Sequence, residues 1–440
     1  MIRTVLATLI ALVALGLTAP AQAAIEIQEV TSPGGFKAWL VEEHSIPFVA
    51  IELRFRGGAS LDAPGKRGAI NLMTGLLEEG AGEMDSQAFA AAREALAARI
   101  SYDVGDDALA ISARFLTENR AQGVELLRAS LVEPRFDPDA IERVRAQVIS
   151  IIRSEAKDPE TIAHDTFARL AFGYHPYGSN PNGTEESVAA LTRDDIIDAW
   201  RRVIAQDRVY VSAVGDITAE ELAAVMDRLL GELPETGAPM PGPAPWLLEG
   251  GLTVVPFETP QSVAVFGQPG IERFDPDFFA AYVLNHILGG GGFSSRLMNE
   301  VREKRGLTYG IYTWLADKDH ADLLMGQFAS ANDRIAAAIE VVKDEWRRIH
   351  DHGVSEEELA EAKTYLTGAY PLRFDGNGRI ASILVGMQMV GLPIDYVKTR
   401  NAKIEAVTLE DVARVAKRLL DPDTLHFVVV GQPAGLEAGK

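Results

Sequence analysis

Alternating apolar and polar residues predict β-strands at comparable places in the two parts of the chain. One strand pattern spans 48–55, and a helical pattern follows it at 67–79. A second strand pattern at 262–266 likewise precedes a helical pattern at 278–288. Because strands and helices come in clusters and not in strict β–α–β alternation, we expect mixed or antiparallel sheets with helices on one face, an α+β fold.

The two parts of the chain end with the same pattern of a helix followed by a strand. Thr192 precedes acidic residues, as a helix N-cap does, and Gly215 follows the predicted strand 23 residues later. Thr408 and Gly431 have the same spacing of 23 residues. A repeat over this distance is too long for a solenoid unit, so it predicts two copies of one α+β domain.

A stretch rich in proline and glycine separates the two predicted domains. Between 234 and 245, its residues of these two types are Pro234, Gly237, Pro239, Pro241, Gly242, Pro243 and Pro245. Such a stretch can form neither a helix nor a central strand. We therefore predict an N-terminal domain at 24–233, a linker at 234–250 and a C-terminal domain at 251–435.

The first 23 residues have the features of a cleavable export signal. Arg3 is followed by an apolar stretch at 5–19, Pro20 ends that stretch, and small residues stand at Ala21 and Ala23. The apolar stretch is shorter than the roughly 20 residues that a membrane-spanning helix needs. We expect cleavage after Ala23, a mature protein in the periplasm, and no membrane span in the mature form.

Charge and composition exclude several classes of function. The chain has 63 acidic and 42 basic residues, a formal net charge of −21, and no cysteine. A surface this negative repels phosphate backbones, so we expect no nucleic-acid partner. The absence of cysteine excludes disulfides, thiolate metal sites and a cysteine nucleophile.

Two adjacent motifs in the second half carry a family resemblance. They are GGGGFSSRL at 289–297 and VREKRGLTY at 301–309. Together with the duplication, they make the chain resemble the insulinase/pitrilysin family of zinc metallopeptidases, the inverzincins. The resemblance implies two homologous α+β domains per subunit and a clamshell of two subunits around an unfolded peptide.

The zinc motif that this resemblance implies is missing. The family carries H-x-x-E-H on a helix of the first half, with a further glutamate downstream. Here the two histidine positions correspond to Asn71 and Gly75, the glutamate position to Thr74, and the downstream glutamate to Ile151. None of these side chains is a good zinc ligand, and a threonine cannot act as a general base at neutral pH. We therefore expect no metal or other cofactor in this chain.

No other metal or nucleophile site is indicated. No pair of the eight histidines has H-x-x-E-H or H-E-x-x-H spacing. The cluster His350-Asp351-His352 precedes Gly353 and is typical of a solvated helix C-terminus. The chain also has neither a G-x-S-x-G nucleophile elbow nor a phosphate-binding P-loop.

Arg302 and Tyr309 stand where the family has residues that reach across the clamshell to the zinc site. The resemblance implies that Arg302 holds the backbone of the bound peptide and that Tyr309 donates a hydrogen bond to the oxyanion. A preorganised donor at a developing negative charge stabilises the transition state. Arg296 and Arg305 lie close in sequence, and with Arg302 they suggest a positive patch for a peptide backbone or a carboxylate.

The glycine-rich run is a candidate for substrate binding. Without a Cβ, a peptide can lie close to its backbone groups. The predicted substrate-binding residues are Gly289, Gly290, Gly291, Gly292 and Phe293.

Two functions remain open from the sequence. The first is the non-zinc subunit of a periplasmic heterodimeric metallopeptidase, active only with a homologous H-x-x-E-H subunit that holds the zinc. The second is a non-catalytic peptide-binding or structural homologue that acts as a homodimer. Arg302 and Tyr309 argue against a purely structural role, because a structural protein needs neither. Nothing in the sequence separates the zinc-free subunit from a peptide-binding homodimer.

Overall fold

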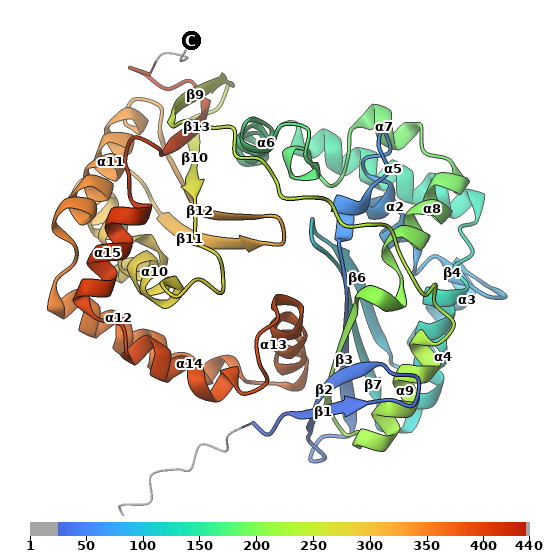
Figure 1. Ribbon diagram of the computed structural model, residues 1–440. Helices are drawn as coiled ribbons and strands as arrows, with labels where there is room; N and C mark the ends of the chain where they lie inside the picture. The colour runs from blue at the N-terminus through green and yellow to red at the C-terminus, as the bar shows by residue number, and fades with distance from the viewer. Residues whose placement is uncertain (1–24, 437–440) are drawn as a thin grey trace, which may run out of the picture.

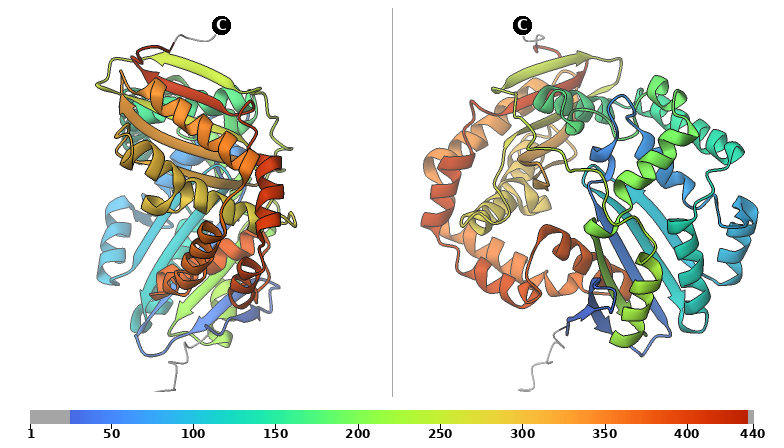
Figure 2. Two further views of the ribbon diagram at one scale, coloured as in Figure 1. Left: turned by 90° about the vertical axis from the view of Figure 1, so that its left-hand side faces the viewer. Right: turned by 45° about the vertical axis from the view of Figure 1, so that its right-hand side comes forward.

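The computed structural model describes residues 25–436, which form two large β-sheets with helices packed against them (Figure 1). The predicted export signal at 1–23 lies outside the described residues. The first sheet and its helices lie on the right of Figure 1, the second sheet and its helices on the left, and two rotated views show the same division (Figure 2). The α+β class predicted from the sequence is confirmed.

The first sheet has six strands in the order β1-β2-β8-β3-β7-β6. All neighbouring strands are antiparallel except β2 and β8, which are parallel. The strands are β1 (Gln28–Thr31), β2 (Lys37–Glu42), β3 (Phe48–Arg56), β6 (Arg99–Val104), β7 (Ala108–Leu116) and β8 (Val209–Gly215). A separate two-stranded ribbon pairs β4 (Gly80–Ala81) with β5 (Met84–Asp85).

The second sheet has five strands in the order β11-β12-β10-β13-β9. Its strands are β9 (Gly251–Pro256), β10 (Gln261–Pro269), β11 (Ile311–Lys318), β12 (Ala321–Ala331) and β13 (His426–Gly431). Apart from the edge strand β1, both sheets place their five strands, counted along the chain, in the spatial order 1-5-2-4-3. In both sheets the first and fifth strands form the parallel pair. This common topology is what the predicted duplication requires.

Fourteen α-helices surround these sheets in the described residues. Those of the first half are α2 (Ala69–Leu76), α3 (Ser86–Ala95), α4 (Arg120–Val132), α5 (Pro138–Glu155), α6 (Pro159–Phe172), α7 (Glu185–Ala189), α8 (Arg193–Val203) and α9 (Ala219–Leu230). Those of the second half are α10 (Phe278–Asn285), α11 (Ile335–His352), α12 (Glu356–Gly368), α13 (Asn377–Val390), α14 (Tyr396–Glu405) and α15 (Leu409–Leu419).

The repeated threonines begin equivalent helices, as the sequence predicts. Thr192 accepts a hydrogen bond from the backbone N–H of Asp195 at the start of α8. Thr408 accepts one from Asp411 at the start of α15. In both cases the aspartate bonds back to the backbone N–H of the threonine. This capping box satisfies backbone donors that have no partner within the helix.

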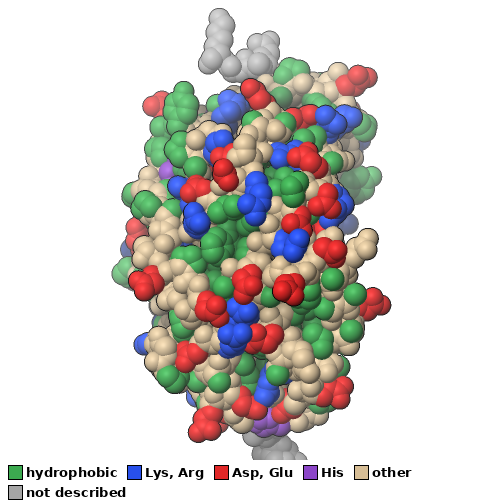
Figure 3. Space-filling view, turned by 90° about the vertical axis from the view of Figure 1, so that its right-hand side faces the viewer, with side chains coloured by type: hydrophobic (Ala, Val, Ile, Leu, Met, Phe, Trp, Pro, Cys, Tyr) green, Lys and Arg blue, Asp and Glu red, His purple; other side chains and the backbone are tan. Residues whose placement is uncertain are grey.

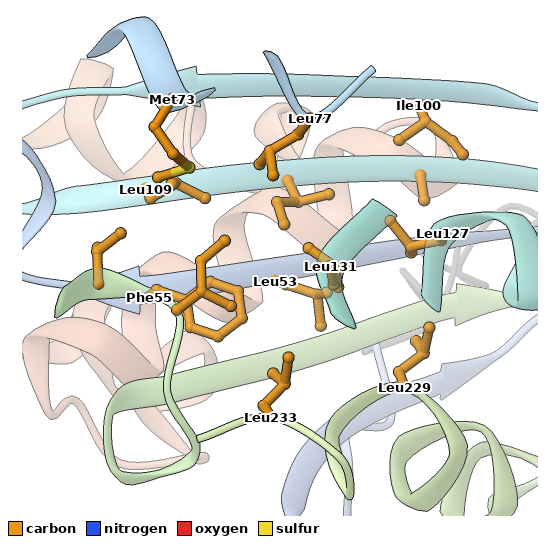
Figure 4. Close-up of a cluster of buried hydrophobic side chains, with 14 of the residues drawn as sticks. Leu53, Phe55, Met73, Leu77, Ile100, Leu109, Leu127, Leu131, Leu229 and Leu233 are labelled. Carbon is orange, nitrogen blue, oxygen red and sulfur yellow. The ribbon is translucent and has the colours of Figure 1, made fainter. Parts of the chain in front are cut away.

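The first core lies between the first sheet and the helices of its own half (Figure 4). Alternate residues of β3, including Leu53 and Phe55, point into it, and Leu127 and Leu131 of α4 meet them. Full burial of each such side chain contributes about 1.5–3 kcal/mol. The other face of the same strand presents Ala50, which packs in a different cluster.

That second face of the first sheet is covered by a helix from the second half. Ala381, Leu384 and Met387 of α13 pack with Trp39 and Val214 of the sheet. The backbone oxygens of the sheet also take part, since Gln388 donates a hydrogen bond of 2.8 Å to the carbonyl of Val211. Figure 1 shows α13 lying between the two halves, beside the first sheet.

In the same way, a helix of the first half packs against one face of the second sheet. Phe167 and Ala171 of α6 pack with Val265 of β10 and Val428 of β13. The own-half face of the same sheet holds a separate aromatic core, in which the ring of Phe266 lies 5.0 Å from that of Phe427 and 5.7 Å from that of Trp346. Each half therefore covers one face of its own sheet and part of one face of its partner's sheet.

The stretch at 234–250 has neither helix nor strand, and it is fixed to α6 and to neighbouring loops. Trp246 lies 6.0 Å from Phe167 and 6.3 Å from Phe172, measured between ring centroids. The backbone N–H of Leu247 donates to the carbonyl of Ala171 at 2.9 Å. The end of the connection is therefore anchored to α6 by aromatic packing and a backbone hydrogen bond.

The hairpin of β11 and β12 carries two facing aspartates whose ionisation opposes folding. Asp317 and Asp322 are cross-strand partners. Burial, followed by the charges of Asp317 and Glu272, raises the pKa of Asp322 to about 6. Like charges directly opposite each other on a sheet are destabilising.

We predict that Asp322→Asn stabilises the protein at pH 7 but not at pH 4. The folded-state pKa of about 6 lies above the ordinary value, so folding favours the protonated carboxyl. This contribution is complete below about pH 4 and is lost as the pH rises through about 6. Melting temperatures of both proteins across pH 4–8 check this. An equal gain at both ends of the range would contradict it.

Candidate functional site

The helix that corresponds to the zinc-motif helix is α2, and a buried aspartate fixes its start. Asp62 accepts hydrogen bonds from the backbone N–H groups of Gly68 at 2.9 Å and Ile70 at 2.8 Å. Burial raises the pKa of this carboxyl, and Arg67 beside it opposes that shift. Gly68 has a φ of 94°, a left-handed conformation that favours glycine. The start of α2 is therefore fixed by backbone hydrogen bonds to one buried carboxylate.

The four positions of the expected zinc site carry no metal-binding side chains. The hydroxyl of Thr74 is buried and donates to the carbonyl of Ile70 at 2.8 Å within its own helix. Gly75 has no side chain, and a Cβ there would lie 3.0 Å from Val144. Ile151 on α5 is 49% exposed and offers only carbon. The residues present do not fit zinc.

At the first position of the zinc motif, Asn71 takes part in a hydrogen-bond network with a second amide and a carboxylate. Asn71 donates to the side-chain oxygen of Asn182 at 2.9 Å, and Asn182 donates to both carboxylate oxygens of Glu155 at 2.9 and 3.0 Å. Glu155 lies one helical turn beyond Ile151 on α5. Sequence reasoning missed this network, although the i+4 position of Glu155 was a signal for it. Within residues 25–436, no three histidines or carboxylates are placed to hold a metal ion.

Arg302 and Tyr309 line one cavity of about 420 Å³ in the second half. Its wall is formed by the end of η7 (Met298–Glu303), the loop before β11, and the adjoining ends of β10 and β12. Gln261, Ser330 and Arg334 complete it. No residue of α2 or α5 lines this cavity, so the chain by itself does not join the Arg/Tyr pair to the former zinc positions.

The guanidinium of Arg302 is positioned by an aromatic ring. It lies 4.7 Å above the ring centroid of Phe293, a cation–π contact. Its closest carboxylate oxygen belongs to Glu303 at 3.5 Å. One guanidinium nitrogen, Nη1, is buried without a hydrogen-bond partner in the described residues. A buried donor left unpaired is unfavourable, so this nitrogen gains from donating a hydrogen bond to a ligand oxygen.

Tyr309 is 85% exposed at the mouth of the cavity. The residue before it is fixed, since the hydroxyl of Thr308 donates to the carbonyls of Ala329 at 2.6 Å and Gly310 at 2.9 Å. The loop therefore presents the Tyr309 side chain to solvent from an ordered backbone. A phenol in this position can donate to a group that approaches from outside the chain.

The glycine-rich run has a structural explanation at its start. Gly289 is buried, and a Cβ on it would lie 2.9 Å from the backbone nitrogen of Thr313 on β11. Gly291 has as little free space, because a Cβ on it would lie 2.7 Å from the carbonyl oxygen of His286. This corrects the prediction that Gly289 binds substrate, because a neighbouring strand already occupies its open side. Gly290, Gly292 and Phe293 are exposed.

The positive patch suggested by the sequence is largely neutralised. Both Nε and Nη2 of Arg296 donate to the carboxylate of Glu358, at 2.5 and 2.7 Å. Arg305 donates to Glu300 at 2.6 Å. Only Arg302 of the three lacks a carboxylate hydrogen bond in the described residues. The expected patch is therefore a single available guanidinium.

Comparison with known proteins shows which family the chain resembles. Residues 190–366 match the profile described as the peptidase M16 inactive domain. A crystal structure of a peptidase M16 inactive domain from Pseudomonas fluorescens superposes with a TM-score of 0.87 at 26% identity, covering 94% of this chain and 100% of that one. The chain is therefore similar to M16 peptidases over nearly its whole described length. The resemblance predicted from the sequence is thereby confirmed.

Relatives of this M16 homologue differ in how they are described. It is 26% identical over 426 residues to the non-peptidase homologue YmxG of Helicobacter pylori, covering 97% of this chain and 98% of that protein. It is 25% identical over 403 residues to an uncharacterised zinc protease of Streptomyces coelicolor, covering 90% and 87%. The chain thus resembles M16 proteins, one of them described as a non-peptidase homologue, and it lacks the side chains of the zinc motif.

Two further features concern one face of the surface and the apolar character of the helices. Figure 3 shows acidic and basic side chains interspersed across the helical side of the first half, with no continuous basic stripe on that face. Such a stripe is the usual footprint of nucleic-acid binding. Among the described helices, none combines the length and the apolar character needed to cross a bilayer.

Proposed function

We propose that this chain is the zinc-free subunit of a heterodimeric M16 peptidase. Arg302 and Tyr309 serve an active site whose zinc is held by a homologous H-x-x-E-H subunit. One observation carries this proposal: both side chains line one cavity, while the chain's own zinc positions are lost. A chain that kept the pair for its own zinc would have kept the zinc ligands too.

Each of the two side chains has a distinct role in this proposal. The guanidinium of Arg302, held over Phe293, binds a backbone carbonyl of an extended peptide. The exposed phenol of Tyr309 donates to the oxyanion that forms on the scissile carbonyl in the partner's site. The exposed glycines at 290 and 292 allow the peptide backbone to pass close to this wall.

The proposal also places the protein in the periplasm. The export signal at 1–23 supports this, and N-terminal sequencing of the protein from a periplasmic extract tests it. A mature chain that begins at Ala24 is the expected result. A chain that keeps Met1 and stays with the cytoplasmic fraction would contradict the placement.

Reconstitution with an H-x-x-E-H homologue from the same genome tests the function. Each subunit is purified alone and after co-expression, and zinc content and cleavage of a fluorogenic peptide are measured. We expect no stoichiometric zinc and no cleavage for this chain alone. The pair is expected to elute as one species with one zinc and to cleave the peptide.

Two results would overturn the proposal. A partner that is as active alone as in the mixture would remove any need for this subunit. One tightly held zinc in the isolated chain would contradict the loss of its metal site. A homodimer that binds peptide without cleaving it would support the alternative of a non-catalytic binding protein.

A further inference from the structure

A second cavity, of about 480 Å³, lies where α10, α13 and α14 approach one another. It shares no lining residue with the Arg302/Tyr309 cavity. Figure 1 shows α13, α14 and α10 around the space between the two halves. Three arginines line it: Arg273, Arg373 and Arg400.

None of these three arginines forms an ion pair with a carboxylate in residues 25–436. Arg400 is only 5% exposed, and its guanidinium donates to the carbonyl of Leu366 and to the side chains of Asn401 and Tyr282, all neutral. Arg273 donates to the hydroxyl of Tyr396 at 2.6 Å. A buried cation with only neutral partners is unusual, because desolvation of its charge is not compensated.

Neighbouring arginines outside this cavity behave differently. Arg414 donates to Asp277 at 2.6 Å and to Asp411 at 2.8 Å, and Arg418 donates to Asp275 at 2.8 Å. In a chain with a net charge of −21, carboxylates are plentiful. The only acidic residue that lines the cavity is Asp317, so the four charges around it sum to +2. The cavity is therefore a local site for an anion.

Aromatic rings hold the guanidinium groups in place. Arg400 lies 4.2 Å from the ring centroid of Tyr370, and Arg273 lies 4.1 Å from that of Phe278. Tyr370 is 7% exposed, lines the cavity, and its hydroxyl has no hydrogen-bond partner in the described residues. Burial raises the pKa of Tyr370 to about 12, so this hydroxyl stays a neutral donor. Guanidinium groups held in place by aromatic rings, together with a hydroxyl that is free to donate, suit a planar anion.

The rest of the wall is apolar. It includes Phe279, Ile383, Met387, Val390 and Leu392. Cavities of this size and mixed lining are typical of small-ligand sites, in which a few polar groups fix the orientation. An inorganic anion would leave these apolar side chains without contacts. The lining therefore fits an anion attached to an apolar body.

We propose that this cavity binds a carboxylate carried on an apolar body. The carboxylate lies among Arg273, Arg373 and Tyr370, and the apolar part lies against α13. The C-terminus of a peptide that ends in a large apolar residue and a free arylalkyl acid share this chemistry. The proposal does not depend on the function proposed above, because the two cavities are separate.

Calorimetry on the full mature chain tests this site with three probes. They are N-acetyl-leucyl-phenylalanine, its C-terminal amide, and 3-phenylpropionate. We expect the free acid peptide to bind and the amide to bind at least about tenfold more weakly, the usual effect of losing a charge-assisted contact. Binding of 3-phenylpropionate as tight as the peptide identifies a small acid as the ligand; weaker binding identifies a peptide terminus.

Two variants make the test specific. Arg373→Gln changes an exposed residue without an ion pair in the described residues, so the fold should survive, and it should weaken the acid at least about tenfold. Tyr370→Phe should weaken it less. Arg379→Gln, also exposed but outside the lining, is the matched control and should change nothing. Three results would each overturn the proposal. They are equal binding of the acid and the amide, unchanged acid binding by a normally melting Arg373→Gln variant, and displacement of the acid by inorganic phosphate at the same concentration.

Discussion

Replacement of Tyr309 by phenylalanine is expected to lower the kcat of the reconstituted pair about 10²–10³-fold, the usual cost of losing one oxyanion donor. KM should change little, because the hydroxyl acts only when charge develops on the substrate carbonyl. The side chain is 85% exposed, so its loss of one oxygen should leave folding and assembly intact. Steady-state kinetics on a fluorogenic peptide measure both constants.

Two companion variants define what this result means. Tyr312→Phe, three residues away on β11 and outside the cavity, is the matched control and should leave kcat unchanged. Arg302→Ala should raise KM as well as lower kcat, because it removes contacts to the bound peptide before reaction. An unchanged kcat for Tyr309→Phe would mean that this subunit helps to enclose the peptide but takes no part in the reaction.

The sequence predicted those parts of the fold that local signals determine. Thr192 and Thr408 were assigned as caps because an acidic residue three positions later is a local pattern, and both capping boxes form. The duplication followed from equal spacings along the chain. The short motif at 301–309 points to Arg302 and Tyr309 as candidate site residues, and the structure places both in the lining of one cavity.

Other features depend on contacts between residues far apart in sequence and could not be predicted. One such feature is the packing of α6 and α13 on the sheet of the opposite half. The apolar face of a helix in the sequence does not indicate which sheet the helix will cover. The pairing of Arg296 with Glu358 is another. It turned an expected positive patch into an ordinary ion pair. The same limit hid the burial of Gly289 against Thr313.

The three unpaired arginines show the limit most clearly. Arg273, Arg373 and Arg400 come from three separate segments, and no spacing relates them. Each alone is an ordinary surface residue by composition. Only the packing of α10, α13 and α14 brings them around one space. A site of this kind is detectable from charge balance in the folded protein, but not from a motif.

The exchange of α6 and α13 leads to the second large expected effect: Phe167→Ala should lower the free energy of unfolding by about 3–5 kcal/mol. Phe167 is 2% exposed, its ring end lies over Gly267 of the second sheet, and Trp246 of the linker packs beside it. Truncation leaves a cavity between a helix of one half and the sheet of the other. Denaturant unfolding followed by circular dichroism and by tryptophan fluorescence measures the loss.

The same experiment shows whether the halves unfold as one unit. Since each half covers part of the other's sheet, both probes should report a single transition that Phe167→Ala moves as a whole. Leu384→Ala on α13 removes the reciprocal contact and should cost about 2–5 kcal/mol in the same transition. Tyr174→Ala is the control, because that side chain is fully exposed and should change stability by less than about 0.5 kcal/mol. Two separate transitions, only one of them shifted by Phe167→Ala, would show that the exchanged helices do not couple the halves.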